Sequence, residues 1–123
     1  MKKRNVYVVL VDVRSRHNVG SIFRSADGAG ISKIYLCGYT PAPVDRFGRI
    51  VEEIKKTSLG ATETVLWEAG IDVLEVLKRL REDGVTVVVV EQHERSIPYT
   101  EFIPTGDTAY IFGNEREGVS SEI

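Results

Sequence analysis

Apolar residues follow two spacings along this chain, and together they predict alternating strands and helices. Short β-branched and apolar runs are typical of strands that are buried in a sheet. Such runs predict five strands, at Val6–Val11, Lys33–Cys37, Glu63–Trp67, Val85–Val90 and Thr108–Phe112. Val85–Val90 has the strongest β character, so we expect it to be a central strand.

Helical spacing predicts the segments between these strands. The first helix is expected to start near Asn18, a candidate N-cap, and to end near Gly30. Its apolar positions are Val19, Ile22, Phe23, Ala26 and Ala29. Further helices are predicted at Ile50–Lys56, at Asp72–Glu82 and from Gly118 onward, and loops at Gly38–Gly48 and Glu91–Asp107. Strands that alternate with helices favour an α/β fold with a mostly parallel sheet and helices on both faces.

Length and composition place the chain among ordinary globular proteins. The 123 residues suffice for one domain with its own core, and 42% are apolar while 28% are charged. We see no secretory-signal pattern and no run long enough to cross a membrane. A single cysteine, Cys37, cannot form an internal disulfide, so we expect a cytoplasmic protein in which this residue packs in the core.

Charge is distributed unevenly along the chain. Residues 1–56 carry eleven Lys and Arg against five Asp and Glu, whereas residues 57–123 carry five against thirteen. A basic half can be a footprint for phosphate groups. From charge alone, ordinary solvated surface is the favoured interpretation.

Several nucleotide and metal sites are disfavoured by the sequence. Gly113 and Gly118 have the spacing of P-loop glycines, but Val119 stands where that motif requires Lys. No Gly-x-Gly-x-x-Gly follows the first strand, so a dinucleotide fingerprint is absent. His17, His93 and one Cys supply no zinc-ligand spacing, and we expect no metal.

Two segments at strand ends carry candidate chemistry. Asn18 lies at a predicted strand-to-helix turn, where backbone N–H groups favour an anion, and Arg24 offers a planar fork of donors just beyond it. Gly113, Asn114 and Glu115 follow the last strand, where open α/β sheets keep their sites. Taken singly, each segment is explained as well by a helix cap with a surface arginine, or by a turn.

The order of these segments resembles the SpoU/TrmH-type RNA 2′-O-ribose methyltransferases of the SPOUT superfamily. The resemblance covers residues 5–123. Its first motif is Asn-x5-Arg at residues 18–24, and its second is Phe-Gly-Asn-Glu-x-x-Gly at residues 112–118. Between them lie Lys-Thr-Ser-Leu-Gly-Ala at 56–61 and a strand that ends in Glu91 and Gln92. It implies a trefoil-knot fold, an S-adenosylmethionine cofactor, an RNA substrate (tRNA or rRNA) and a homodimer without metal.

The resemblance also implies roles for particular residues. Arg24 would activate the 2′-hydroxyl or hold the adjacent phosphate, and Asn18 would position Arg24 or the ribose. Glu115 would orient Arg24 or the loop in which Glu115 lies, near a dimer interface. The implied cofactor-binding residues are Glu91, Gln92, Gly113 and Asn114. The implied RNA-binding residues are Arg14, Arg16, Arg46, Arg49, Lys55 and Lys56.

One family motif has no counterpart in the sequence. The third motif, an Ile-Pro-Met strand followed by a Ser-Leu-Asn-Val-Ser helix, would form the knot and much of the cofactor pocket. We therefore expect residues 1–123 to be a methyltransferase catalytic domain that is incomplete at its C-terminus, of low activity and low solubility. The alternatives are a non-catalytic RNA-binding or dimerisation module of the same fold and an unrelated α/β nucleotide-binding protein.

Overall fold

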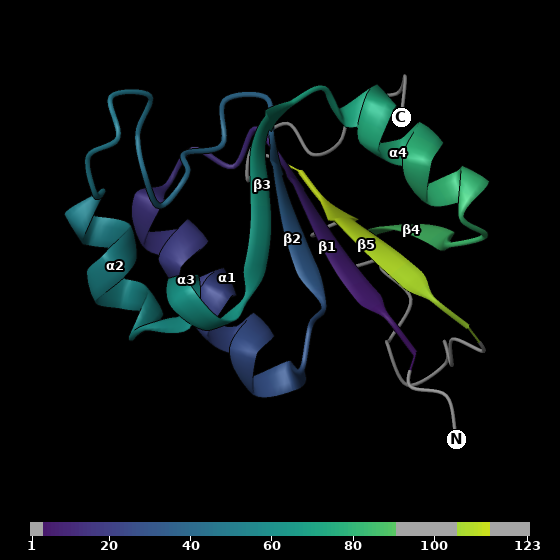
Figure 1. The fold of residues 1–123 in the computed structure, drawn as a ribbon, viewed down its shortest axis with the longest axis horizontal. Helices are drawn as coiled ribbons and strands as arrows, with labels where there is room; N and C mark the ends of the chain where they lie inside the picture. The colour runs from purple at the N-terminus through teal and green to yellow at the C-terminus, as the bar shows by residue number, and fades with distance from the viewer. Residues whose placement is uncertain (1–3, 91–105, 114–123) are drawn as a thin grey trace.

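The structure, a computed structural model, describes residues 4–90 and 106–113. They form a parallel five-stranded sheet in the order β3-β2-β1-β5-β4 (Figure 1). The strands are β1 Val6–Val11, β2 Lys33–Cys37, β3 Leu66–Ile71, β4 Thr86–Val90 and β5 Thr108–Phe112. In the centre of the sheet, Leu10 of β1 pairs with Leu36 of β2 on one side and with Phe112 of β5 on the other. This arrangement confirms the predicted mostly parallel α/β sheet.

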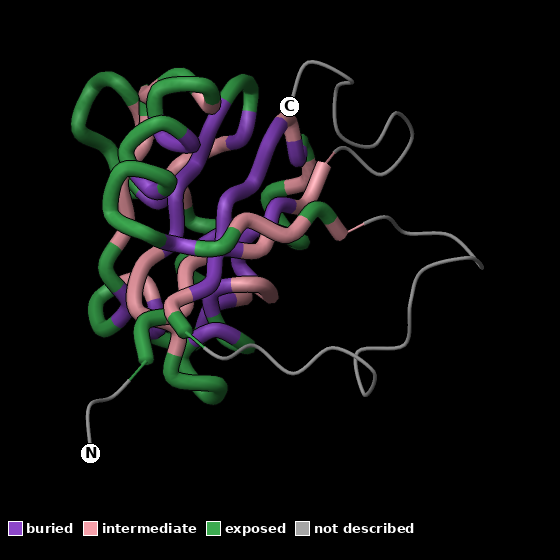
Figure 2. Tube along the Cα trace, turned by 90° about the vertical axis from the view of Figure 1, so that its right-hand side faces the viewer, coloured by how far each residue is buried: buried purple, intermediate pink, exposed green. Residues whose placement is uncertain are grey.

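Helices cover both faces of the sheet, as predicted. They are α1 Arg16–Ala29, α2 Glu52–Ser58, α3 Ala61–Thr64 and α4 Val73–Glu82. The first three lie on one face and α4 lies on the other (Figure 1). Alternation along β1 divides the core, because Val8 and Leu10 point toward α1 whereas Val9 and Val11 point toward α4. In Figure 2 the buried parts of the trace run mainly through the strands.

The first helix starts three residues earlier than the sequence predicts. Ser15, not Asn18, is the N-cap, and its Oγ accepts a hydrogen bond of 3.1 Å from the backbone N–H of Asn18. Asn18 was a wrong prediction as a cap because Ser15 is an equally good capping residue and lies closer to the end of β1. Gly30 ends the helix in a left-handed conformation, as predicted.

Two strand predictions are wrong in detail. Val85–Val90 was expected to be central, but β4 lies at the edge of the described sheet, where Val89 is 42% exposed. β-branched side chains favour a strand because they pack well on a pleated sheet, but they do not predict whether that strand is central or at an edge. Glu63–Trp67 was expected to be a strand, but its first residues belong to the helical turn α3, which Val65 closes by donating to the Ala61 carbonyl over 2.9 Å.

Helices α1 and α2 are in close contact at Gly20. A Cβ added at Gly20 would overlap Thr57 Oγ1 and would lie 2.9 Å from the Ile54 carbonyl oxygen. Gly20 therefore sets how near α2 can lie to α1. Within the described residues, no helix has the length and apolar character needed to cross a membrane.

Candidate functional site

A pocket of about 290 Å³ lies between α1 and the end of β5. It forms there because β1 and β5 are paired neighbours, so the chain that leaves β1 for α1 passes beside the carboxyl end of β5. Open α/β sheets bind ligands at this edge. The residues that line the pocket are Val13, Asn18, Ser21, Ile22, Ser25, Phe112 and Gly113.

One stripe of α1 supplies most of the polar groups in the pocket. Asn18, Ser21 and Ser25 are spaced about one turn apart and therefore share a face. Val19, Phe23 and Ala26 form a separate stripe that is buried in the core. The sequence analysis singled out Asn18 but missed the two serines, although the polar repeat at positions 18, 21 and 25 was a usable signal.

The donor set of this pocket suits a nucleoside. An amide side chain and two hydroxyls can exchange hydrogen bonds with ribose hydroxyls. Apolar walls from Ile22 and Phe112 can hold a planar base or a sugar face. Gly113 brings backbone close to the ligand space, as expected for a glycine at a strand end. The described residues thus fit a ribose-bearing substrate or cofactor.

Arg24 belongs to the helix that lines this pocket but is not part of the pocket lining. The residue precedes Ser25 on α1 and is exposed, as predicted from its position outside the apolar stripe. It follows Gly20 by four residues, so it lies on the flank of α1 that includes the contact with α2. Among the described residues it has no hydrogen bond or salt bridge, which leaves its guanidinium available to a ligand.

Four predicted site residues lie outside the described residues. These are the predicted orienting residue Glu115 and the predicted cofactor-binding residues Glu91, Gln92 and Asn114. Of the predicted catalytic and cofactor-binding sets, the structure brings Asn18 and Gly113 together at the pocket, whereas Arg24 lies on the same helix as Asn18 but outside the pocket lining.

The six predicted RNA-binding cations are all exposed. Arg14 and Arg16 lie where β1 turns into α1, and Arg46 and Arg49 lie in the loop that follows β2. Arg14 reaches that loop, since its guanidinium carbon is 5.7 Å from the ring centre of Tyr39. Figure 1 shows both loops at the carboxyl end of the sheet. Lys55 and Lys56 lie in the last turn of α2.

Hydrogen bonds join these two loops at their base. The Oγ1 of buried Thr40 accepts from the Val13 backbone N–H over 3.1 Å and donates to the Leu10 carbonyl over 3.3 Å. The Asp12 carboxylate accepts from the Tyr39 backbone N–H over 2.7 Å. The sequence analysis identified neither Asp12 nor Thr40. The pocket and the basic loops therefore share one rigid base.

Other titratable groups do not form a second centre in the described residues. Burial raises the pKa of the Cys37 thiol to about 12, which fits the predicted core role and not a nucleophile. No three His, Cys, Asp or Glu side chains within ranges 4–90 and 106–113 are grouped as a metal would require. The absence of a metal in the active protein remains a prediction.

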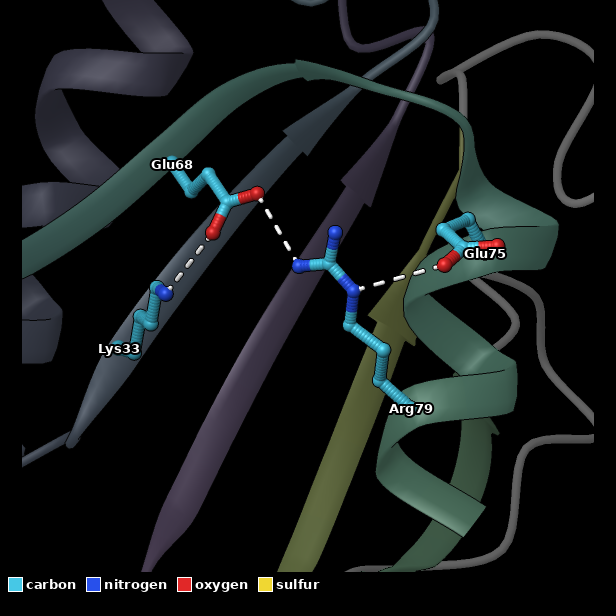
Figure 3. A network of polar contacts seen from close by, with 4 residues as sticks. All are labelled: Lys33, Glu68, Glu75 and Arg79. Atoms are coloured by element: carbon cyan, nitrogen blue, oxygen red, sulfur yellow. Dashed lines mark hydrogen bonds and ion pairs between the residues drawn. The ribbon is translucent and has the colours of Figure 1, made fainter. Parts of the chain in front are cut away.

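A polar network on the opposite face of the sheet fixes α4 (Figure 3). Glu68 of β3 accepts from Lys33 of β2 over 3.1 Å and from Arg79 of α4 over 3.3 Å. Arg79 also lies 3.7 Å from Glu75. The hydrogen bond from Lys33, more than the charge of Arg79, holds the pKa of Glu68 below its ordinary value. This network joins three elements and is structural.

Known proteins match this chain in sequence. A sequence profile described as the SpoU rRNA Methylase family matches residues 5–123. The 23S rRNA (guanosine-2′-O-)-methyltransferase RlmB of Neisseria meningitidis is 26% identical, over 91% of this chain and 42% of that protein. The tRNA (guanosine(18)-2′-O)-methyltransferase of Thermus thermophilus is 28% identical, over 98% of this chain and 58% of that protein.

Solved structures match the fold as well. An AdoMet-bound rRNA methyltransferase from Sinorhizobium meliloti superposes with a TM-score of 0.83 at 27% identity, over 98% of this chain and 44% of that one. The chain thus spans between 42% and 58% of the length of these three proteins. The profile match over residues 5–123 confirms the resemblance that the sequence motifs indicated. The chain belongs to the SpoU rRNA Methylase family.

Proposed function

We propose that this protein transfers a methyl group from S-adenosylmethionine to a ribose 2′-hydroxyl of tRNA or rRNA. The observation that carries the proposal is the pocket in which Asn18 and Gly113, from two separate family motifs, meet at the carboxyl edge of the sheet. The names of the relatives from Neisseria and Thermus, both guanosine 2′-O-methyltransferases, support it. We further propose that the protein is a cytoplasmic homodimer that uses no metal.

The pocket residues are proposed to bind and align the ribose. S-adenosylmethionine supplies an electrophilic methyl group on a positively charged sulfur. The 2′-oxygen must lie in line with that methyl, and such alignment can remove much of the barrier. Asn18 would hold the ribose through its amide, with Ser21 and Ser25 on the same helix face. Gly113 and the predicted residues Glu91, Gln92 and Asn114 would line the cofactor.

Arg24 is proposed to stabilise the charge that develops on the 2′-oxygen as its proton leaves. A guanidinium keeps its charge, so it suits an electrostatic role better than that of a base. Its exposed position beside Ser25 also lets it hold the phosphate next to the reacting ribose. Glu115 would orient Arg24 in either case.

A methyl-transfer assay tests the proposal. Radiolabelled S-adenosylmethionine is incubated with the chain and bulk tRNA or rRNA, and 2′-O-methylation is read as nucleotide linkages that resist alkaline hydrolysis. We expect Arg24→Ala to lower the rate by about 100-fold or more, in the range of lost proton-transfer or charge stabilisation. Arg81→Ala is the matched control, since Arg81 is exposed on α4, which covers the other face of the sheet.

Calorimetric titration with S-adenosylmethionine separates the possible failures. Binding of the cofactor with a methyl group found on a base, not on ribose, would contradict the proposed reaction. RNA binding by a folded chain that does not bind the cofactor would favour the non-catalytic RNA-binding module.

A further inference from the structure

A small hairpin follows β2 and projects from the carboxyl end of the sheet. Val44 and Ile50 form an antiparallel bridge. The Asp45 backbone N–H donates to the Arg49 carbonyl over 2.9 Å, and the Val51 N–H donates to the Pro43 carbonyl over 2.9 Å. We call residues 43–51 the basic hairpin. Its backbone is closed by its own hydrogen bonds.

Asp45 fixes the tip of the basic hairpin. One carboxylate oxygen accepts from the backbone N–H of Phe47 over 2.9 Å and from that of Arg49 over 3.0 Å. The other oxygen lies 3.4 Å from Arg49 Nε. The backbone hydrogen bond from Arg49, with that from Phe47, holds the pKa of Asp45 below its ordinary value. The tip is therefore an ordered turn although it is exposed.

The tip presents an exposed aromatic ring that two arginines contact. Phe47 is 66% exposed, so its ring is not used to fill the core. The guanidinium carbons of Arg46 and Arg49 lie 4.9 Å and 5.0 Å from the ring centre. An exposed phenyl ring with two guanidinium groups at cation–π distance suits a planar partner that carries negative charge.

A second exposed ring with its own arginine lies at the start of the same loop. Tyr39 is 76% exposed, and Arg14 lies over it. The hydrogen bond between Asp12 and the Tyr39 backbone ties this ring to the end of β1. Two aromatic rings and three arginines are thus offered by neighbouring loops at the edge that holds the pocket.

Unpaired RNA is the partner whose chemistry matches both features. Nucleobases have flat faces that stack on aromatic rings, and each is followed by a phosphate that an arginine can bind. Aromatic and arginine side chains also occur in protein interfaces, so the choice of RNA follows from the proposed RNA substrate, whose phosphates can pair with the guanidinium groups. Duplex RNA offers phosphates, 2′-hydroxyls and base edges, but its base faces are stacked inside and are not available to an aromatic ring.

We propose that Phe47 stacks on an unpaired nucleobase of the bound RNA, with Arg46 and Arg49 on the flanking phosphates. The inference rests on the proposed function in taking RNA as the substrate. It goes further by naming the class of RNA element that the protein selects, a single-stranded loop or bulge. Tyr39 with Arg14 forms a second stacking position on the same surface.

Binding of labelled RNA, measured by fluorescence anisotropy without cofactor, tests the inference. For an unstructured RNA oligonucleotide, we expect Phe47→Ala to weaken binding by about ten-fold, the usual effect of losing one stacked base. Phe47→Trp should restore binding. Leu74→Ala is the matched control, because Leu74 is also an exposed apolar residue but lies on α4. A thermal melt of each variant confirms that it is folded.

Salt dependence separates stacking from charge. Phe47→Ala should leave the slope of log affinity against log salt concentration unchanged, whereas Arg46→Ala should reduce that slope by about 0.7. A blunt RNA duplex of the same sequence should bind the Phe47→Ala chain and the parent chain equally.

Three results of binding measurements would overturn the inference. In the first, the parent chain does not bind RNA. In the second, the Phe47→Ala chain binds single-stranded RNA as tightly as the parent chain does. In the third, the Phe47→Ala chain loses self-association but keeps its RNA affinity. The last would make the basic hairpin a protein interface. Methyl transfer at an unchanged KM by the Phe47→Ala chain would reject the stacking role while leaving the proposed function intact.

Discussion

At the scale of single residues, side chains with similar sequence signals have different roles in the structure. Asn18 and Ser15 both have side chains that cap helices, and only their distance from the end of β1 decides that Ser15 is the cap. Asn18 is thereby placed about one turn from Ser21 and two turns from Ser25, and all three line the pocket. Cys37, which the sequence analysis predicted to be a core residue, is fully buried.

The burial of Cys37 leads to a reactivity prediction. Its pKa is raised from an ordinary 9.0 to about 12, so at a given pH the native chain holds on the order of 1,000-fold less thiolate than the unfolded chain. We expect the native thiol to resist iodoacetamide at pH 8 and to react readily in urea. Labelling followed by mass spectrometry measures this. Equal labelling rates in both conditions would show that the thiol is accessible in the folded state.

The raised pKa of Cys37 also makes the stability of the chain depend on pH in the alkaline range. The folded state keeps the thiol proton while the unfolded state loses it, so the free energy of unfolding should fall as pH rises from about 9 toward 12. A Cys37→Ala chain should lack this part of the decline.

At the scale of elements, the sequence predicted three strands with their observed bounds: Val6–Val11, Lys33–Cys37 and Thr108–Phe112. These strands form the centre of the sheet, where burial on both faces makes the apolar run continuous. For β4 the predicted strand was observed but its predicted central position was wrong, because a run of valines carries no information about which strands lie beside it. The hairpin at 43–51 was expected only as loop, since its order depends on hydrogen bonds to Asp45 that no periodicity reveals.

The contact between α1 and α2 predicts opposite effects for two glycines of one helix. Gly20→Ala should destabilise the chain by about 1–3 kcal/mol, because the new methyl group would overlap Thr57, whose hydroxyl is hydrogen-bonded to the Glu53 carbonyl over 2.8 Å. Gly28→Ala is the matched control. It has no atom within 4 Å of an added Cβ, so the higher helix propensity of Ala should stabilise by about 0.5–1 kcal/mol.

Urea unfolding of both variants gives these free energies. A Gly20→Ala chain as stable as the parent would mean that α2 can move away from α1 at no cost.

At the scale of the whole molecule, the two faces of the sheet have different tasks. The face with α1, α2 and α3 carries the pocket, whereas on the face with α4 the network around Glu68 holds the helix against the strands. The sequence predicted the layers, because apolar periodicity is a property of each element. It could not predict the network, since Lys33, Glu68 and Arg79 are brought together only by the order of strands.

The Glu68 network predicts a pH and salt dependence of stability. The pKa of this carboxyl is lowered in the folded state, so its contribution is present above the ordinary value of 4.5 and is lost as pH falls through the folded value. Glu68→Gln should lower the free energy of unfolding at pH 7 by about 0.5–1 kcal/mol, a modest amount because the pairs are partly exposed and screened.

Thermal melts between pH 3 and pH 7 at low and high salt measure this contribution, with the peripheral Glu75→Gln as control. An equal effect of the two substitutions would show that the central position of Glu68 in the network confers no additional stability.

The closed hydrogen bonding of residues 43–51 makes this segment exchangeable. Because Pro43 and Val51 seal its base and Thr40 ties the preceding residues to the strand ends, a longer or shorter turn could be inserted there without shifting the start of α1. Under the proposed function, we expect replacement of this segment alone to change which RNA is bound and to leave the methyl-transfer chemistry unchanged. Such a division lets target choice diversify in evolution, or in the laboratory, independently of catalysis.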